Sequence, residues 1–160
     1  MIKEIRMSGR GGQGVILAGI ILAEAAGLYE GKEVIHAQDY GGQVRGGAVR
    51  SDVLIGDPGE EIIYPVVINA DILMVLSQEA ADRWVGRVKE NGHILFDSTY
   101  VTKISHPSAE IYSIPLTATM EKEMGTSLGA NIMMLGVVCE LMQLVSKDAL
   151  AWAVHQRAPK

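Results

Sequence analysis

A glycine-rich loop near the N-terminus holds the residues best suited to chemistry in this sequence. It reads Gly9-Arg10-Gly11-Gly12-Gln13-Gly14 and has the spacing Gly-x-Gly-x-x-Gly. Glycines allow tight turns with positive φ and let a ligand approach the backbone. The free N–H groups and the dipole of a following helix attract an anion. The loop therefore predicts phosphate or carboxylate binding, with Arg10 adding a positive charge. The alternative is that the glycines only let the helix pack closely on the sheet.

A second glycine-rich segment reads Tyr40-Gly41-Gly42-Gln43-Val44-Arg45-Gly46-Gly47, and Arg50 follows it. The guanidinium groups of Arg45 and Arg50, with the amide of Gln43 and the flexible Gly46 and Gly47, suit an anion clamp or a subunit contact. Both loops are expected at the same end of the sheet, beyond the carboxyl ends of the strands, where ligands bind in open α/β folds. A surface loop with solvated arginines is the simpler alternative.

The first loop also has the glycine spacing of a dinucleotide site, but the companion acidic residue is misplaced. That fingerprint needs an Asp or Glu about 20 residues further on, at the end of the second strand. Here Asp39 comes late and enters the second loop, and Glu33 stands at the beginning of the expected strand. A standard dinucleotide site is therefore not favoured, and an autonomous dinucleotide-binding oxidoreductase is kept as an alternative.

The remaining reactive residues predict neither a catalytic set nor a metal site. His36, His93, His106 and His155 are far apart, and none shares a metal-ligand spacing with another His or Cys. The one cysteine, Cys139, lies in an apolar run and is expected to be a buried, inert thiol. A chain with one cysteine also cannot supply the thiolates of an iron–sulfur cluster alone.

Charge and hydropathy exclude several classes of protein. The formal net charge is -5 over 160 residues, whereas nucleic-acid binding needs a basic footprint. No run approaches the roughly 20 apolar residues that a membrane helix needs, and the N-terminus lacks the apolar stretch of a signal peptide. We therefore expect no nucleic-acid or membrane partner, and a cytoplasmic location.

Strands and helices are expected to alternate along the chain and to position both loops. The apolar patterns predict strands at 2–7, 33–38, 48–55, 72–76, 93–96 and 109–114. Helices are expected at 15–28, from Ser77 to Gly92, and at 117–124, 131–145 and 146–155. The first strand, helix and second strand then form a βαβ unit. In the third strand, Arg50 and Asp52 share a face that is expected to be polar or to line a site. The pattern predicts one α/β domain over residues 1–160, with three α/β/α layers and a mostly parallel, Rossmann-like sheet.

The two glycine blocks together resemble the gamma subunit, or gamma domain, of the 2-oxoacid:ferredoxin oxidoreductases that act on pyruvate, 2-oxoglutarate or ketoisovalerate. The resemblance spans nearly the whole chain. Further matches are Arg50-Ser51-Asp52, Asn69-Ala70-Asp71, Pro115 with Thr117-Ala118, and Asn131-Ile132-Met133-Met134-Leu135-Gly136.

The resemblance implies a non-catalytic subunit, inactive alone, in a complex that oxidatively decarboxylates a 2-oxoacid to an acyl-CoA and passes electrons to ferredoxin. Thiamine diphosphate, magnesium and iron–sulfur clusters are then expected on the alpha and beta subunits and on any ferredoxin-like delta subunit, and not on this chain. The gamma subunit is expected to help bind coenzyme A at the first loop and to assemble the complex, with 2-oxoglutarate favoured as the substrate. A purely structural subunit is the alternative.

Overall fold

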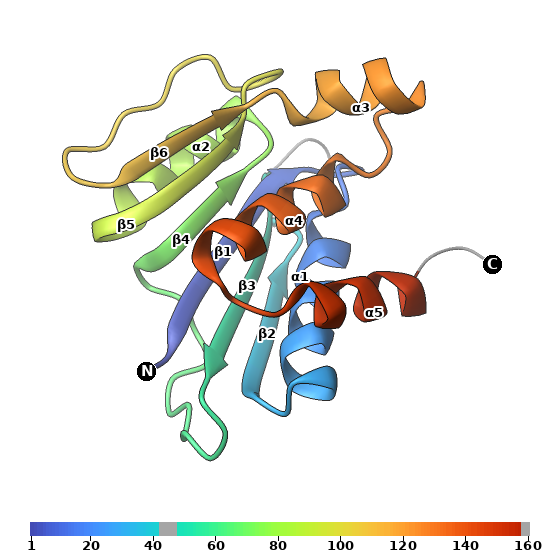
Figure 1. Ribbon diagram of the computed structural model, residues 1–160. Coiled ribbons are helices and arrows are strands. Elements are labelled where there is room, and N and C mark those ends of the chain that lie inside the picture. The colour runs from blue at the N-terminus through green and yellow to red at the C-terminus, as the bar shows by residue number, and fades with distance from the viewer. Residues whose placement is uncertain (42–47, 158–160) are drawn as a thin grey trace.

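The computed structural model describes residues 1–41 and 48–157, which form a six-stranded sheet with helices on both faces (Figure 1). The strands are β1 (Lys3–Arg10), β2 (Glu33–Asp39), β3 (Ala48–Gly56), β4 (Ala70–Val75), β5 (Val88–Asp97) and β6 (Glu110–Ile114). The helices are α1 (Val15–Glu24), α2 (Gln78–Trp84), α3 (Leu116–Met124), α4 (Ala130–Met142) and α5 (Lys147–Arg157), with a π-helical turn η1 (Ala25–Tyr29) after α1 and a 3₁₀ turn η2 (Val85–Arg87) after α2. The predicted α/β class is confirmed.

The sheet is mostly parallel, with one strand running against its neighbours. The strand order is β2-β3-β1-β4-β5-β6. β1, β4, β5 and β6 pair in parallel, and β3 is antiparallel to both β1 and β2. The sequence predicts a βαβ unit from β1, α1 and β2, and these two strands do run the same way, but β3 lies between them. This happens because the chain folds back after β2, so that β3 pairs with β1 from Lys3↔Ile55 to Arg10↔Ala48.

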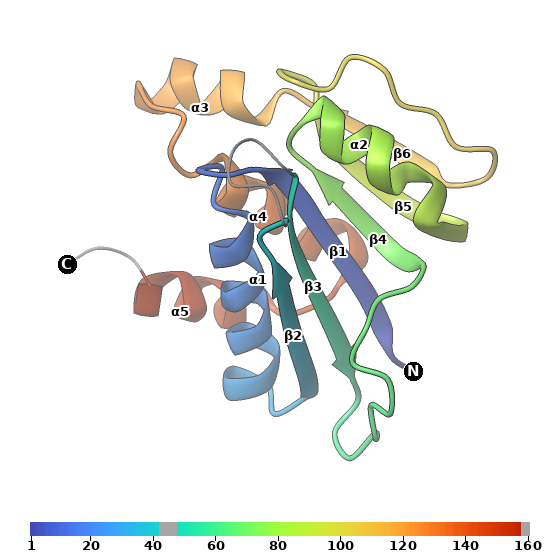
Figure 2. The same cartoon turned by 180° about the vertical axis from the view of Figure 1, so that it is seen from behind.

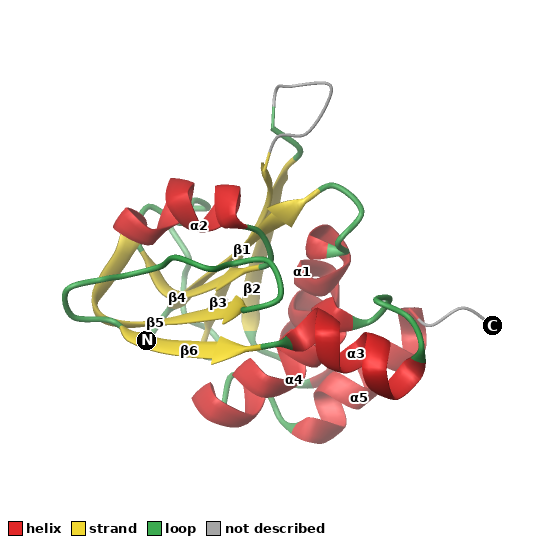
Figure 3. Cartoon of the chain, turned by 90° about the horizontal axis from the view of Figure 1, so that it is seen from above, coloured by secondary structure: helices red, strands yellow, loops and turns green. Residues whose placement is uncertain are grey.

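Helices α1, α4 and α5 cover one face of the sheet (Figures 1 and 3). Their apolar side chains form the large core with the inward residues of the central strands. Fully buried members of this core are Leu135 on α4, Ile5 on β1 and Met74 on β4. α1 lies closest to β3 at Gly19, where a Cβ atom would overlap the Ser51 hydroxyl. Because α1 is apolar on most of its faces, it needs cover from α5 as well as from the sheet beneath it.

Helix α2 lies over part of the opposite face (Figure 2), and this face has a polar centre beneath the helix. Arg6 and Asp52 are 2% and 1% exposed, and two hydrogen bonds of 2.8 Å join the guanidinium group to the carboxylate. Trp84 of α2 lies over Arg6, whose guanidinium carbon is 4.2 Å from the ring centroid. The Trp84 Nε1 donates to Ser8 Oγ at 3.1 Å. The polar face predicted for the strand of Asp52 is thus a buried ion pair.

The helix expected from Ser77 to Gly92 is shorter than predicted. Ser77 caps it, since its Oγ accepts a hydrogen bond from Ala80 N–H at 3.2 Å, but α2 ends at Trp84. Val88 is buried and pairs with β4, so this β-branched side chain belongs to β5. Gly92 also lies inside β5, where a Cβ would come 2.7 Å from Val88 Cγ1. The prediction is wrong because a glycine needed for packing within a strand resembles a helix stop.

Candidate functional site

The glycine loop lies at the carboxyl edge of the parallel strands, where β1, β4, β5 and β6 all end (Figure 3). The register pairs Arg10 with Ala48, so β3 begins at this edge and β2 ends there. The residues that flank the second glycine segment, Asp39 at the end of β2 and Ala48 at the start of β3, therefore lie at the same edge of the sheet as the first loop. The role predicted for four residues of this segment stays a prediction, because they lie outside the described ranges: Gln43, Arg45, Gly46 and Gly47.

The backbone of the first loop requires two of its glycines. Arg10 O accepts a hydrogen bond from Gln13 N–H at 3.2 Å, which closes a four-residue turn. Gly12, the third residue of that turn, has φ 88°, and Gly14, just before α1, has φ 75°. L side chains rarely adopt such values. Gly11 differs, because its φ is not in this range and a Cβ there would meet no atom within 4 Å. The fold itself leaves the space at Gly11 open.

Gln13 holds the loop against the sheet. Its Oε1 accepts a hydrogen bond from Arg10 N–H at 2.6 Å, and its Nε2 donates to Leu76 O at 2.8 Å, just beyond β4. A Cβ at Gly9 would come 2.7 Å from the same Oε1, so Gly9 keeps room for the Gln13 side chain. The amide of Gln13 therefore fixes the shape of the loop, and the loop backbone presents the groups that can meet a ligand.

Arg10 provides the positive charge predicted beside the loop. Its side chain is exposed, and its guanidinium carbon lies 5.2 Å from the centroid of the Tyr100 ring. This distance is typical of a cation–π contact. Tyr100 in turn lines the cavity next to the loop, so Arg10 stands at the rim of that cavity.

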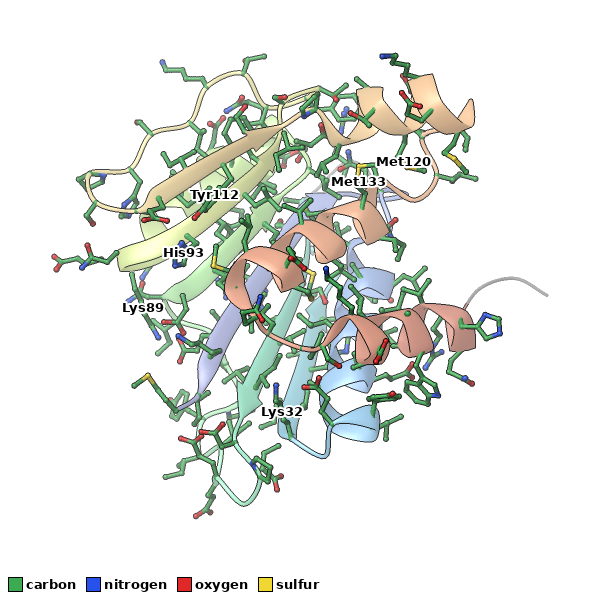
Figure 4. The ribbon with its side chains drawn as sticks, in the orientation of Figure 1. Lys32, Lys89, His93, Tyr112, Met120 and Met133 are labelled. Carbon is green, nitrogen blue, oxygen red and sulfur yellow. The ribbon has the colours of Figure 1, made fainter. Side chains whose placement is uncertain are left out.

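Two helices begin beside this loop without a side-chain cap. Gly14 precedes α1 and Gly129 precedes α4, both with positive φ, and neither offers a side-chain oxygen to the first turn. The first-turn N–H groups and the positive ends of both helix dipoles therefore face the same region. Figure 4 shows Met120 of α3 beside Met133 of α4, near the start of that helix, and Met120 leaves little room for a Cβ at Gly129.

A cavity of about 400 Å³ lies between these two helix starts. The glycine loop and the first turns of α1 and α4 form part of its wall. The rest of the wall includes apolar and aromatic side chains: Leu17, Leu76, Tyr100, Leu128 and Ile132. Small-molecule sites of this size combine apolar walls with a few placed polar groups. The arrangement can bind an anionic group at the amides while an apolar or aromatic part of the same ligand packs on the walls.

The chain shares nearly all of its length with proteins of one family. The family model of pyruvate ferredoxin/flavodoxin oxidoreductase matches residues 4–160. The chain belongs to this family. It is 44% identical over 162 residues to the 2-oxoglutarate synthase subunit KorC of Methanocaldococcus jannaschii, an alignment that covers 100% of this chain and 86% of the relative.

Solved structures of the pyruvate ferredoxin/flavodoxin oxidoreductase family share the fold. The keto/oxoacid ferredoxin oxidoreductase gamma subunit of Geobacter sulfurreducens matches with a TM-score of 0.86 and 41% identity, over 98% of this chain and 87% of that one. The 2-oxoglutarate:ferredoxin oxidoreductase of Magnetococcus marinus, solved with 2-oxoglutarate, coenzyme A and succinyl-CoA bound, has the same TM-score of 0.86 at 23% identity, over 98% of this chain and 27% of that one. The expected resemblance is confirmed, and this family member is a gamma subunit of a 2-oxoacid oxidoreductase complex.

The gamma-subunit cavity includes residues that the sequence predictions left outside the candidate site. Leu128 and Gly129 line it, and so does Asn131, which donates a hydrogen bond from Nδ2 to Gly14 O at 3.0 Å. Gly14 and Asn131 are 117 positions apart in the chain, so residue spacing gives no sign of their contact. The available signal is a glycine before a long apolar helix, which occurs at Gly129 as it does at Gly14.

Arg50 faces the α2 side of the gamma subunit. Its guanidinium nitrogens lie 3.5 Å from carboxylate oxygens of Asp39 and Asp52. Its guanidinium carbon lies 5.3 Å from the centroid of the Trp84 ring. Two carboxylates therefore already form ion pairs with Arg50. The role of Arg50 in an anion clamp stays a prediction.

The other reactive residues of the gamma subunit do not form a metal site. In residues 1–41 and 48–157, no group of three or more His, Cys, Asp or Glu side chains is placed to hold a metal ion. Cys139 is buried, and this burial raises the pKa of its thiol to about 12. The predicted burial is confirmed, and because the thiolate is the reactive form, the raised pKa favours the expected inert character. Within the described ranges, no helix has the length and apolar character needed to cross a membrane.

Proposed function

We propose that this gamma subunit helps a 2-oxoglutarate:ferredoxin oxidoreductase bind coenzyme A, with the diphosphate of the coenzyme at the glycine loop. The observation that carries the proposal is the cavity of about 400 Å³ between the uncapped starts of α1 and α4. The KorC relative, which is 44% identical, supports 2-oxoglutarate as the 2-oxoacid. The structural neighbour solved with coenzyme A supports the class of ligand.

The chemical groups of coenzyme A match the surfaces around this cavity. A diphosphate carries negative charge that first-turn amides and helix dipoles attract. Gly11 and Gly12 have no atoms near the Cβ position, so a phosphate can approach their backbone. The guanidinium group of Arg10 at the rim can donate two hydrogen bonds to a phosphate, and the aromatic Tyr100 gives the adenine ring a surface for stacking. These residues bind and orient the coenzyme.

The proposal places thiamine diphosphate, magnesium and the iron–sulfur clusters on the alpha and beta subunits and on any ferredoxin-like delta subunit of a cytoplasmic complex, with ferredoxin as the electron acceptor. Thiamine diphosphate supplies the carbanion chemistry when bound there. The Magnetococcus marinus neighbour is a 2-oxoglutarate:ferredoxin oxidoreductase in which the matching region is 27% of a longer chain, and this supports a gamma region that works beside other parts of the enzyme. The gamma subunit then contributes its coenzyme A surface to a site that its partners complete.

The fold argues against an autonomous dinucleotide-binding oxidoreductase. In the dinucleotide fold, the strand after the first helix lies next to the first strand, and its acidic residue meets the ribose. Here β3 separates β2 from β1. Asp39, at the end of β2, accepts a hydrogen bond from Gly41 N–H at 2.8 Å and lies 3.5 Å from Arg50. Its carboxylate is therefore engaged and is one strand too far from the glycine loop.

Replacement of Arg10 tests the proposal directly. An Arg10→Ala complex should show a KM for coenzyme A raised by at least about tenfold, because a hydrogen bond to a charged group contributes about 1.5–3 kcal/mol. Arg87→Ala is the matched control, since Arg87 is an exposed arginine on η2. Steady-state kinetics of the complex reconstituted with its alpha and beta subunits measures both. An unchanged constant in Arg10→Ala would remove Arg10 from this role, and unchanged constants in both Arg10→Ala and Gly11→Ala would refute the site.

A further inference from the structure

We propose that Asn131 is a positioning residue for coenzyme A, which holds the starts of α1 and α4 so that both face one ligand. The inference rests on the proposed function, which assigns the coenzyme to the cavity between these helices. Asn131 is the second residue of α4 and is 7% exposed. Its Nδ2 donates to Gly14 O at 3.0 Å, so one hydrogen bond links the two helix starts directly.

The acceptor of this bond is a backbone atom at the point where the glycine loop becomes a helix. Gly14 has φ 75°, and its carbonyl also accepts the first hydrogen bond of α1, from Ala18 N–H at 3.0 Å. Asn131 therefore binds the first turn of α1 itself and not a side chain that could rotate away. The fit is close, because a Cβ on Gly14 would overlap the Asn131 amide. A shift of either helix start would break this contact.

Two side-chain amides hold the loop from opposite sides. Gln13 ties it to the end of β4 through Leu76 O at 2.8 Å, and Asn131 ties it to α4. Between Arg10 and these anchors lie Gly11 and Gly12, and glycines have more backbone freedom than other residues. A ligand that must first order a loop binds less tightly than one that meets a preorganised loop. Loss of Asn131 should therefore lower the affinity for the coenzyme.

The expected effect is specific to one substrate. A neutral hydrogen bond of this kind contributes enough to change an affinity by about fivefold to tenfold. The KM for coenzyme A should rise by that factor in Asn131→Leu, which removes the donor and keeps the branched shape of the side chain. The proposed complex has its 2-oxoacid pocket and its electron carriers on the other subunits, so kcat and the KM for 2-oxoglutarate should not change.

The experiment uses the complex of the gamma subunit with its alpha and beta partners. Asn131→Leu and Asn131→Ala are measured together, so that one variant is available if the other does not fold, and thermal unfolding checks both. Asn69→Ala is the matched control, because Asn69 is exposed and undergoes the same chemical change outside the cavity. Calorimetric titration of coenzyme A into the purified complex gives its Kd without turnover, and the Kd should rise by the same factor as the KM.

Each outcome decides between the inference and the proposed function on which it rests. Unchanged KM and Kd for coenzyme A in the Asn131 variants, together with a raised KM in Gly11→Ala, would overturn the inference and leave the coenzyme site in place. Unchanged values in both Asn131→Leu and Gly11→Ala would overturn the site as well. A joint loss of kcat and of affinity for both substrates would show a merely structural role for Asn131 and would also overturn the inference.

Discussion

Removal of the negative charge of Asp52 should strongly destabilise the fold. Asp52→Asn keeps the volume of the side chain but leaves Arg6, which is 2% exposed, without its counter-charge. It also weakens two hydrogen bonds of 2.8 Å and leaves Arg50, at 3.5 Å, with one carboxylate neighbour fewer. Breaking a buried ion pair by removing one partner costs about 3–5 kcal/mol. For a chain of 160 residues, where 1 kcal/mol shifts Tm by roughly 2–4 °C, the expected loss is roughly 6–20 °C.

Differential scanning calorimetry and urea denaturation of the purified gamma subunit measure this loss. Asp82→Asn is the matched control, because Asp82 is an exposed aspartate on α2 and should change the free energy of unfolding by less than about 0.5 kcal/mol. The double variant Arg6→Met, Asp52→Leu should regain most of the lost stability, since an apolar pair can replace a buried ion pair at little cost. A loss below about 1 kcal/mol in Asp52→Asn, the value of an exposed pair, would refute the reasoning that the Arg6–Asp52 pair beneath α2 is shielded from water.

Three further predictions concern other parts of the subunit. Gly11→Ala should raise the KM for coenzyme A and leave the free energy of unfolding within about 0.5 kcal/mol of the parent. Gly12→Ala should lower the free energy of unfolding by about 1–2 kcal/mol, because the φ of Gly12 is 88°. Urea denaturation and kinetics of the complex check both variants. Burial lowers the pKa of His36 from 6.5 more than nearby Asp52 raises it. The stability that neutral His36 contributes is therefore fully present above pH 6.5 and is lost as the pH falls through the lower pKa of the folded state. Denaturation between about pH 8 and pH 5 should show this slope, and a His36→Gln variant should lose it. Cys139, with a thiol pKa of about 12, should be alkylated by iodoacetamide at about pH 8 only when the subunit unfolds, as mass spectrometry in urea would show.

The fold class could be predicted because hydropathy alone locates most of the elements. The short apolar run at β4 predicts a strand that is covered on both faces, and the structure confirms it with α2 on one side and the large core on the other. The insertion of β3 between β1 and β2 could not be predicted in the same way. It brings together residues such as Arg6 and Asp52, which are 46 positions apart, and a local pattern carries no information on such a register.

The candidate site was predictable only on one side. Glycine spacing followed by an apolar helix predicts the loop before α1, since that signal lies within six consecutive residues. The start of α4 forms the other side of the cavity. The position of this helix start beside Gly14 is set by the packing of two helices that are far apart in the chain. The same spacing could not show that Gln13 bonds Leu76 O and so anchors the loop, because this partner belongs to a different strand end.

The central position of β1 has a consequence for how the subunit folds. Its partners in the sheet are β3 and β4, both of which are synthesised after it, so β1 must wait for two later strands before it can pair. Such non-local pairing is slow compared with the closing of a hairpin. The hairpin of β2 and β3 can form early, and β1 then joins it to the parallel strands. Deletion of this strand would leave a two-stranded ribbon and a three-stranded sheet with no backbone hydrogen bonds to connect them.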